Sequence, residues 1–169
     1  MNSDIFYLAG AIFIGVGATA IMDLWAIVLR RAFNIQSLSF CLVGRWFSHM
    51  REGIFRHEKI GAAEKRTGEC AIGWVAHYLI GIAYAFVLVL PASGAWLISP
   101  SLMPALALGI VTVIFPFFMM QPAFGLGIAA AKAPNPMQAR AKSLMSHTVF
   151  GAGLYLSALV FSALMRAII

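Results

Sequence analysis

The chain has 169 residues, of which 62% are hydrophobic and only 11% are charged, and its mean hydropathy is +0.89. This composition excludes an ordinary soluble globular protein and predicts that the lipid bilayer is the main partner of the chain. The net charge of +6 does not indicate nucleic-acid binding, because nearly all the basic residues lie in two connections between apolar runs, where membrane topology explains them.

Apolar runs long enough to cross a bilayer recur along the chain, since a span needs about 20 largely apolar residues. We expect an all-α polytopic membrane protein, a four transmembrane helix bundle that forms a single integral membrane domain over residues 1–169. The spans are predicted at about 5–29, 70–90, 102–131 and 143–165. Pro116 and Pro122 should kink the third span, because each proline removes a backbone donor and crowds the preceding turn.

The connection after the first span, the predicted cytoplasmic loop 30–69, holds eight of the 12 Lys and Arg residues. Apolar residues recur in it at helical spacing, namely Leu42, Val43, Trp46, Phe47, Met50 and Ile54. We expect an amphipathic helix here, which either lies on the inner membrane surface or packs as a cap over the bundle. In the same loop we expect His49 and His57 to be solvated or to contact lipid headgroups.

The remaining connections differ in charge, because residues 91–101 hold no Lys or Arg and residues 132–142 hold three. Basic connections lie preferentially in the cytoplasm, so we expect both termini in the periplasm. Cys41 and Cys70 then fall on the cytoplasmic side, where thiols stay reduced. They form no CxxC or metal-ligand spacing, so we expect neither a disulfide nor a redox motif.

A short pattern recurs between alternate spans and indicates an internal repeat. The second and fourth spans share a histidine, a glycine and a tyrosine, which are His77, Gly81 and Tyr84 against His147, Gly151 and Tyr155. The first and third spans echo each other more faintly, as Gly15, Thr19 and Asp23 against Gly109, Thr112 and Gln121. Because each unit is a pair of spans, the repeat predicts two pseudo-symmetric helix pairs related by an axis along the membrane normal.

Each span carries one polar residue in its cytoplasmic half, and these are Asp23, His77, Gln121 and His147. A polar or ionisable group inside a span is costly, so it usually faces the bundle interior and marks a functional site. Small residues on the same helix faces would let the helices approach closely, namely Gly15, Thr19, Gly73, Gly81 and Gly151. We therefore expect the four polar residues to line one shared cavity.

Several functions are compatible with this set of residues. The leading hypothesis is a small transporter-like, proton-coupled or ion-coupled protein, in which Asp23 carries charge, the histidines accept protons and Gln121 orients the ligand. The alternatives are a b-type haem electron carrier with His77 and His147 as axial ligands, a transition-metal site with the same histidines, and a structural membrane subunit in which the cluster only fixes helix packing.

An enzyme is not expected, because the sequence contains no nucleophile elbow, phosphate-binding glycine loop or HExxH motif. Four short helices enclose little volume, so we expect a homodimer if a wide pathway exists.

Segments from all four spans resemble one known group. They are GVGATAIMDLW at 15–25, GWVAHY at 73–78, MQPAFG at 120–125 and SLMSH at 143–147. Over nearly its whole length the chain resembles the bacterial inner-membrane proteins grouped as domain-of-unknown-function family 2938. The resemblance implies a Gram-negative plasma-membrane location and a family-wide signature around Asp23, His77, Gln121 and His147. It implies no catalytic assignment.

Overall fold

A computed structural model describes residues 3–90 and 95–168, and this part of the chain is helical and contains no strand. The long helices are α1 (Ser3–Phe33), α3 (Glu69–Val89) and α7 (Pro136–Ile168). A fourth stretch, Leu102–Ala123, is built from α5 (Leu102–Val111), the π-helical turn η2 (Pro116–Met120) and α6 (Gln121–Ala123). All four are long and apolar enough to cross a membrane, which supports the predicted multi-pass membrane protein.

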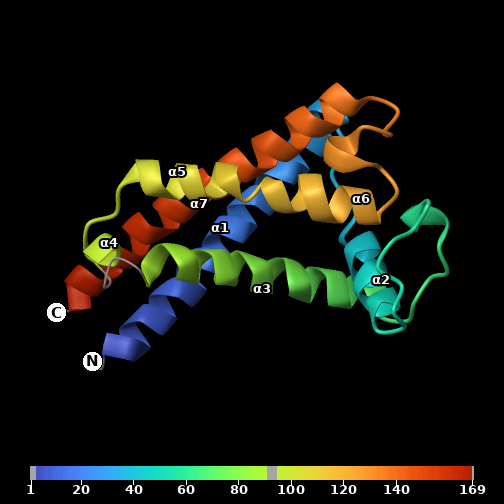
Figure 1. Cartoon of the computed structure of the whole chain (residues 1–169). Helices are drawn as coiled ribbons and strands as arrows, with labels where there is room; N and C mark the ends of the chain where they lie inside the picture. The colour runs from blue at the N-terminus through green and yellow to red at the C-terminus, as the bar shows by residue number, and fades with distance from the viewer. Residues whose placement is uncertain (1–2, 91–94, 169) are drawn as a thin grey trace.

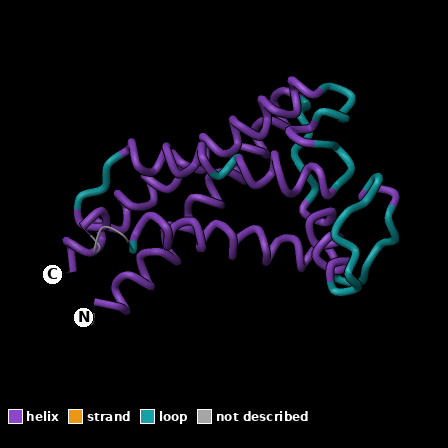
Figure 2. Tube along the Cα trace, viewed as in Figure 1, coloured by secondary structure: helices purple, strands orange, loops and turns teal. Residues whose placement is uncertain are grey.

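The helices pack in a defined order, in which α1 contacts both α3 and α7, and α7 contacts α5 (Figure 1). Both termini lie at one end of the bundle, and the other end carries α2 (Phe40–Met50) and most of the irregular connections (Figures 1 and 2). The short helix α4 (Ala95–Ile98) lies near the termini, and residues 91–94 of the uncharged connection lie outside the described residues. The main apolar core joins the long helices through residues such as Ile14, Leu97 and Leu154.

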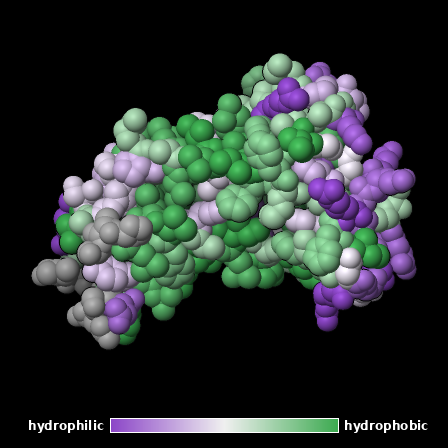
Figure 3. Space-filling model, in the orientation of Figure 1, coloured by the Kyte–Doolittle hydropathy of each residue, from purple (hydrophilic) through white to green (hydrophobic). Residues whose placement is uncertain are grey.

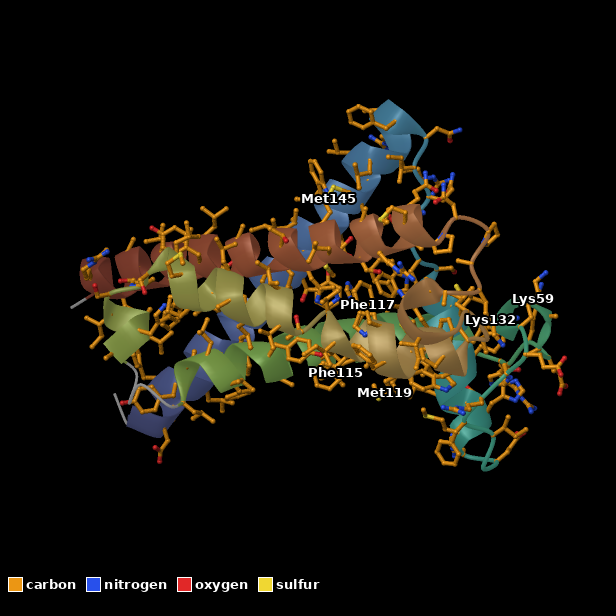
Figure 4. The ribbon with its side chains drawn as sticks, turned by 45° about the horizontal axis from the view of Figure 1, so that its top comes forward. Lys59, Phe115, Phe117, Met119, Lys132 and Met145 are labelled. Atoms are coloured by element: carbon orange, nitrogen blue, oxygen red, sulfur yellow. A yellow bond between two sulfur atoms is a disulfide. The ribbon has the colours of Figure 1, made fainter. Side chains whose placement is uncertain are left out.

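Polar residues gather at the end that carries α2, whereas the middle of the molecule presents hydrophobic side chains (Figure 3). Lys59 of the first basic connection and Lys132 of the second lie at this same end (Figure 4). We call it the basic end. The two basic connections therefore share one side of the predicted membrane, as the charge pattern requires.

The third span is shorter and less regular than predicted. It ends at Ala123 and not near residue 131, and residues beyond it include a short 3-10 turn η3 (Ile128–Ala130) in which Ala129 and Ala130 have positive φ. The α-helical pattern of α5 also stops at Val111, before Pro116. Pro116 has no N–H to donate to the carbonyl of Thr112, so the regular α-helical bonding cannot continue there.

The fourth span begins earlier than predicted, at Pro136 and not at residue 143. Proline is favoured at the first helical position because its missing donor is not needed there. Asn135 caps the helix, since its side-chain oxygen accepts a hydrogen bond from the backbone N–H of Gln138 at 3.1 Å.

At the basic end, α2 packs across the start of α3. Val43 and Trp46 of α2 are buried together with Ile60 of the 3-10 turn η1 (Ile60–Ala62) and with Phe124. The sequence prediction for His49 was wrong, because its ring is buried and lies 3.0 Å from the carbonyl oxygen of Glu64. Residues 51–68 fold back over α2 and remove His49 from solvent, which helical spacing alone could not indicate.

The prediction for the cysteines was also wrong, because Cys41 of α2 and Cys70 of α3 are joined by a disulfide. Their Cα atoms lie 3.8 Å apart although 29 positions separate them in the sequence. The approach depends on glycine, since a Cβ on Gly44 would overlap the backbone of Glu69 and a Cβ on Gly73 would overlap that of Phe40. The spacing of the cysteines in the sequence contains no information about this crossing.

Candidate functional site

Glycines let α1 and α3 cross in close contact. A Cβ on Gly15 would overlap the backbone of Ile82, and a Cβ on Gly81 would overlap the hydroxyl of Thr19. That hydroxyl donates a hydrogen bond to the carbonyl oxygen of Gly15 at 2.7 Å. Small residues of this kind let two helix backbones approach, so side chains on the neighbouring turns can meet.

The carboxylate of Asp23 on α1 meets two polar groups of α3. Its Oδ1 lies 3.0 Å from Nε2 of His77, and the hydroxyl of Tyr78 donates to its Oδ2 at 3.0 Å. Only 16% of the Asp23 side chain and 10% of the His77 side chain are exposed. A carboxylate oxygen accepts hydrogen bonds, so Nε2 of His77 is the donor in this contact.

This group lies well inside the predicted membrane. At about 1.5 Å per residue, Asp23 is about 10 Å along α1 from Arg30, and His77 is about 12 Å along α3 from Glu69. Because both residues lie on regular helices, their backbones hold the carboxylate and the imidazole in place.

Aromatic rings enclose the imidazole of His77 on the side of α2. Phe40 stacks on it, with ring centroids 3.8 Å apart and planes at 26°. Trp74 presents an edge contact at 5.9 Å and is itself 45% exposed on the outside of the bundle. The site therefore lies where α1, α2 and α3 meet, behind an aromatic wall.

The helices α5 and α7 cross in a similar way and hold the second histidine. A Cβ on Gly109 would lie 2.6 Å from both the Cα of Gly151 and the carbonyl oxygen of His147. The hydroxyl of Thr112 donates to the carbonyl oxygen of Gly109 at 2.6 Å and lies 2.8 Å from Nδ1 of His147. A hydroxyl has one hydrogen, so Thr112 accepts a hydrogen bond from Nδ1–H, and Nε2 of the neutral ring carries the lone pair.

Gln121 follows directly after the π-helical turn, and its N–H donates to the carbonyl of Pro116. The side chain is only 5% exposed, and its amide nitrogen donates to Oγ of Ser143 at 3.2 Å. Its amide oxygen is buried without a hydrogen-bond partner. Ser143 lies one turn before His147 on α7, so the amide and the imidazole occupy neighbouring positions along one helix face.

The four predicted residues thus fall into two groups. Asp23 and His77 are in direct contact, whereas Gln121 and His147 belong to the contacts of α7. Within residues 3–90 and 95–168, no hydrogen bond joins one group to the other, so the four residues are not linked in one hydrogen-bonded network.

Sequence reasoning gave no role in the site to three hydrogen-bonding partners, Tyr78, Thr112 and Ser143. Ser143 could have been found, because residues four apart share a helix face and Ser143 precedes His147 by four. Tyr78 could not, because it is adjacent to His77 and adjacent residues point in different directions. His77 and Tyr78 both reach Asp23 because each of them binds a different oxygen of its carboxylate.

The main electrostatic features outside the spans lie at the basic end. Arg45 forms a bidentate ion pair with Glu69, with both N···O distances 2.8 Å, and the hydrogen bond to Glu69 raises the pKa of Arg45 above its ordinary value. Burial lowers the pKa of His57, and the nearby ring of His49, with its centroid 5.0 Å away, lowers it further.

The metal-site hypothesis has no donor set in the described part of the chain, where no three side chains of His, Cys, Asp or Glu are grouped so that they could hold an ion. His77 is bound to one carboxylate, and His147 is bound to one hydroxyl. The contacts described above are hydrogen bonds between polar side chains of neighbouring helices.

Comparison with known proteins gives one match. The family model described as "Protein of unknown function (DUF2938)" matches residues 12–161, which include all four spans and both polar groups. Searches of the curated proteins and of the solved structures found no similar protein.

Proposed function

The chain belongs to the DUF2938 family of proteins of unknown function, and from its own polar groups we propose that it is a proton-coupled carrier of a small polar solute. Asp23 and His77 would be the proton-binding pair, and His147 with Gln121 would hold the solute. We also propose a plasma-membrane location, with the basic end in the cytoplasm and both termini in the periplasm, because basic connections lie preferentially in the cytoplasm.

The observation that carries the proposal is the contact between the carboxylate of Asp23 and the imidazole of His77 inside a span, with 3.0 Å between oxygen and nitrogen. A charged carboxylate in a span is costly unless other groups stabilise it. Here an imidazole and a phenol do so. Proton uptake by either member of this pair would change the hydrogen bond between them, which would link proton binding to the contact between α1 and α3.

The second group offers complementary chemistry without a carboxylate. Nε2 of His147 can accept a hydrogen bond, and the amide oxygen of Gln121 is buried and lacks a donor. A buried polar atom without a partner costs free energy that a bound molecule can recover. A small uncharged solute with hydroxyl or amino donors would supply the missing hydrogen bond.

The similarity of the two crossings supports the predicted duplication. Gly15 and Gly81 bring α1 and α3 together, and Gly109 and Gly151 bring α5 and α7 together. The contacts join α1 to α3 and α5 to α7, which are the two units that the sequence repeat predicts, and they also join the units to each other through α1 and α7. Such repeats are common in transporters, where binding sites form near the interface between the units.

Proton flux in proteoliposomes tests the proposal. The full chain would be reconstituted with a pH-sensitive dye inside the vesicles, and a potassium diffusion potential would be imposed. We expect inward proton flux with the native chain and none with Asp23→Asn, because the amide cannot ionise. Asp4→Asn removes a carboxylate from the exposed start of the same helix and should leave the flux unchanged.

Equal flux with the native chain and Asp23→Asn would contradict the proposal. The haem alternative has an independent test, since ligation by two histidines gives a Soret band and sharp reduced bands. A purified preparation from haem-replete cells that shows those bands would favour an electron carrier instead.

The homodimer also stays a prediction. An apolar groove on α1, lined by Ala9, Ile12, Phe13, Val16 and Gly17, is one surface on which a second helix could pack. Cross-linking of single cysteines placed on this face, in native membranes and on a background without Cys41 and Cys70, would detect the dimer.

A further inference from the structure

The disulfide links the beginnings of two helices at the basic end. Cys41 is the second residue of α2 and Cys70 is the second residue of α3. They are the 2 cysteines of the chain, so no other thiol can compete for either of them. The N-terminal turn of a helix favours a thiolate, because its free N–H groups and its dipole stabilise negative charge.

The two sulfurs differ in access. Cys70 is exposed on the outside of the bundle, whereas Cys41 is partly covered. An external thiol can therefore reach Cys70 more easily. Attack on Cys70 makes Cys41 the leaving group, and its thiolate is released at the start of α2, where the helix dipole stabilises negative charge.

The position of the pair conflicts with a purely structural role. It lies at the end that carries eight basic residues in one connection and three in the other, which the positive-inside rule assigns to the cytoplasm. Disulfides in that compartment are usually transient, catalytic or redox-sensing, since cellular thiols reduce them.

The crossing of α2 and α3 has other contacts that hold it together. The guanidinium of Arg45 binds both oxygens of Glu69, and both side chains are largely buried. Gly44 and Gly73 allow the two backbones to touch. Reduction of the disulfide would leave these contacts in place, so the fold can tolerate both redox states.

We propose that Cys41 and Cys70 form a redox-active pair that exchanges two electrons with a cytoplasmic dithiol at the membrane surface. A thiolate of the dithiol attacks Sγ of Cys70, the bond between the two cysteine sulfurs breaks, and Cys41 leaves as a thiolate. The second thiolate of the dithiol then attacks the other sulfur of the same dithiol, which is bonded to Cys70 in the mixed disulfide. That bond breaks, and Cys70 leaves as a thiolate. The protein gains two electrons and, after protonation, two thiols, and the dithiol becomes a disulfide.

The test uses the full chain in inverted and right-side-out membrane vesicles, with dithiothreitol and oxidised glutathione as probes. After dithiothreitol, we expect two thiols to react with a membrane-impermeant maleimide in inverted vesicles only, which gives a gel shift for both cysteines. Oxidised glutathione should abolish that shift reversibly. In Cys41→Ser, glutathione should remain attached to Cys70, because the resolving thiol is missing.

Three results would overturn the proposal. The first is a disulfide that dithiothreitol cannot reduce unless the protein is unfolded. The second is labelling from the periplasmic face, which would make the disulfide a structural link in an oxidising compartment. The third is a Cys41→Ser/Cys70→Ser double variant that does not fold, whereas we expect it to elute and melt like the native chain in its reduced form.

Discussion

The pair α1 and α3 and the pair α5 and α7 are built on the same plan but carry different chemistry. In each pair glycines on both helices allow close crossing, and a threonine hydroxyl donates back to a glycine carbonyl, from Thr19 to Gly15 and from Thr112 to Gly109. Each pair also holds a histidine, at position 77 or 147, one turn before the glycine of its second helix, Gly81 or Gly151. The same types of contact therefore occur in both pairs, although the hydrogen-bond partner of the histidine differs.

The difference lies in what each histidine contacts. His77 meets the carboxylate of Asp23, whereas His147 meets the hydroxyl of Thr112. The helix α1 is continuous through Asp23, but the corresponding span in the second pair is interrupted by the π-helical turn that precedes Gln121. Irregular turns of this kind often occur at functional sites. The two pairs therefore differ in chemistry, since one offers a carboxylate and the other a hydroxyl and an amide.

The largest expected effect comes from the glycines, because they determine whether the pairs can form at all. Gly15→Ala and Gly109→Ala each place a Cβ against the backbone of the partner helix, so we expect each to destabilise the protein by about 1–3 kcal/mol. Thermal unfolding in detergent would measure this. Gly61→Ala is the matched control, because a Cβ there meets nothing within 4 Å.

If only one of the two variants is destabilised, the two crossings are not equivalent. The comparison between the helix pairs would then rest on the polar residues alone, and the duplication would lose its main structural support.

The next effect separates the polar groups. Asp23→Leu removes two hydrogen bonds between helices and Thr112→Val removes one, and such bonds are worth on average about 0.6 kcal/mol each in membranes. We expect Asp23→Leu to lower stability more and to abolish proton flux, whereas Thr112→Val should weaken but not abolish it. Thr148→Val on α7 is the control, since its hydroxyl bonds only within its own helix at 2.9 Å.

A loss of flux in Thr112→Val as complete as that in Asp23→Leu would contradict the division of roles. The two pairs would then act as one proton path, with His147 taking part in it directly.

The spans could be predicted from the sequence because length and hydropathy determine them locally. Pro136 shows the limit of that reasoning, since α7 begins there, seven residues before the predicted start at residue 143. The additional residues form a polar but helix-compatible segment. The contact of Asp23 with His77 joins residues 54 positions apart, and only its residue types and depth could be inferred. The disulfide and the burial of His49 depend on how α2 packs across α3. The helical spacing of apolar residues in the sequence does not indicate this packing.

The smallest expected effect concerns pH, and it shows how to separate the helix pairs from the basic end. The pKa of His57 is lowered mainly by burial and further by His49, so the unfolded chain binds its proton more readily than the folded chain does. Stability from this residue is complete above its ordinary pKa of about 6.5 and falls as the pH drops below that value. His57→Gln should flatten the pH dependence of the melting temperature below about pH 6.5. The decrease in melting temperature caused by Asp23→Leu should be the same with and without His57→Gln. A pH profile of His57→Gln that matches that of the native chain would contradict this prediction, because the pH sensitivity would then arise from another group.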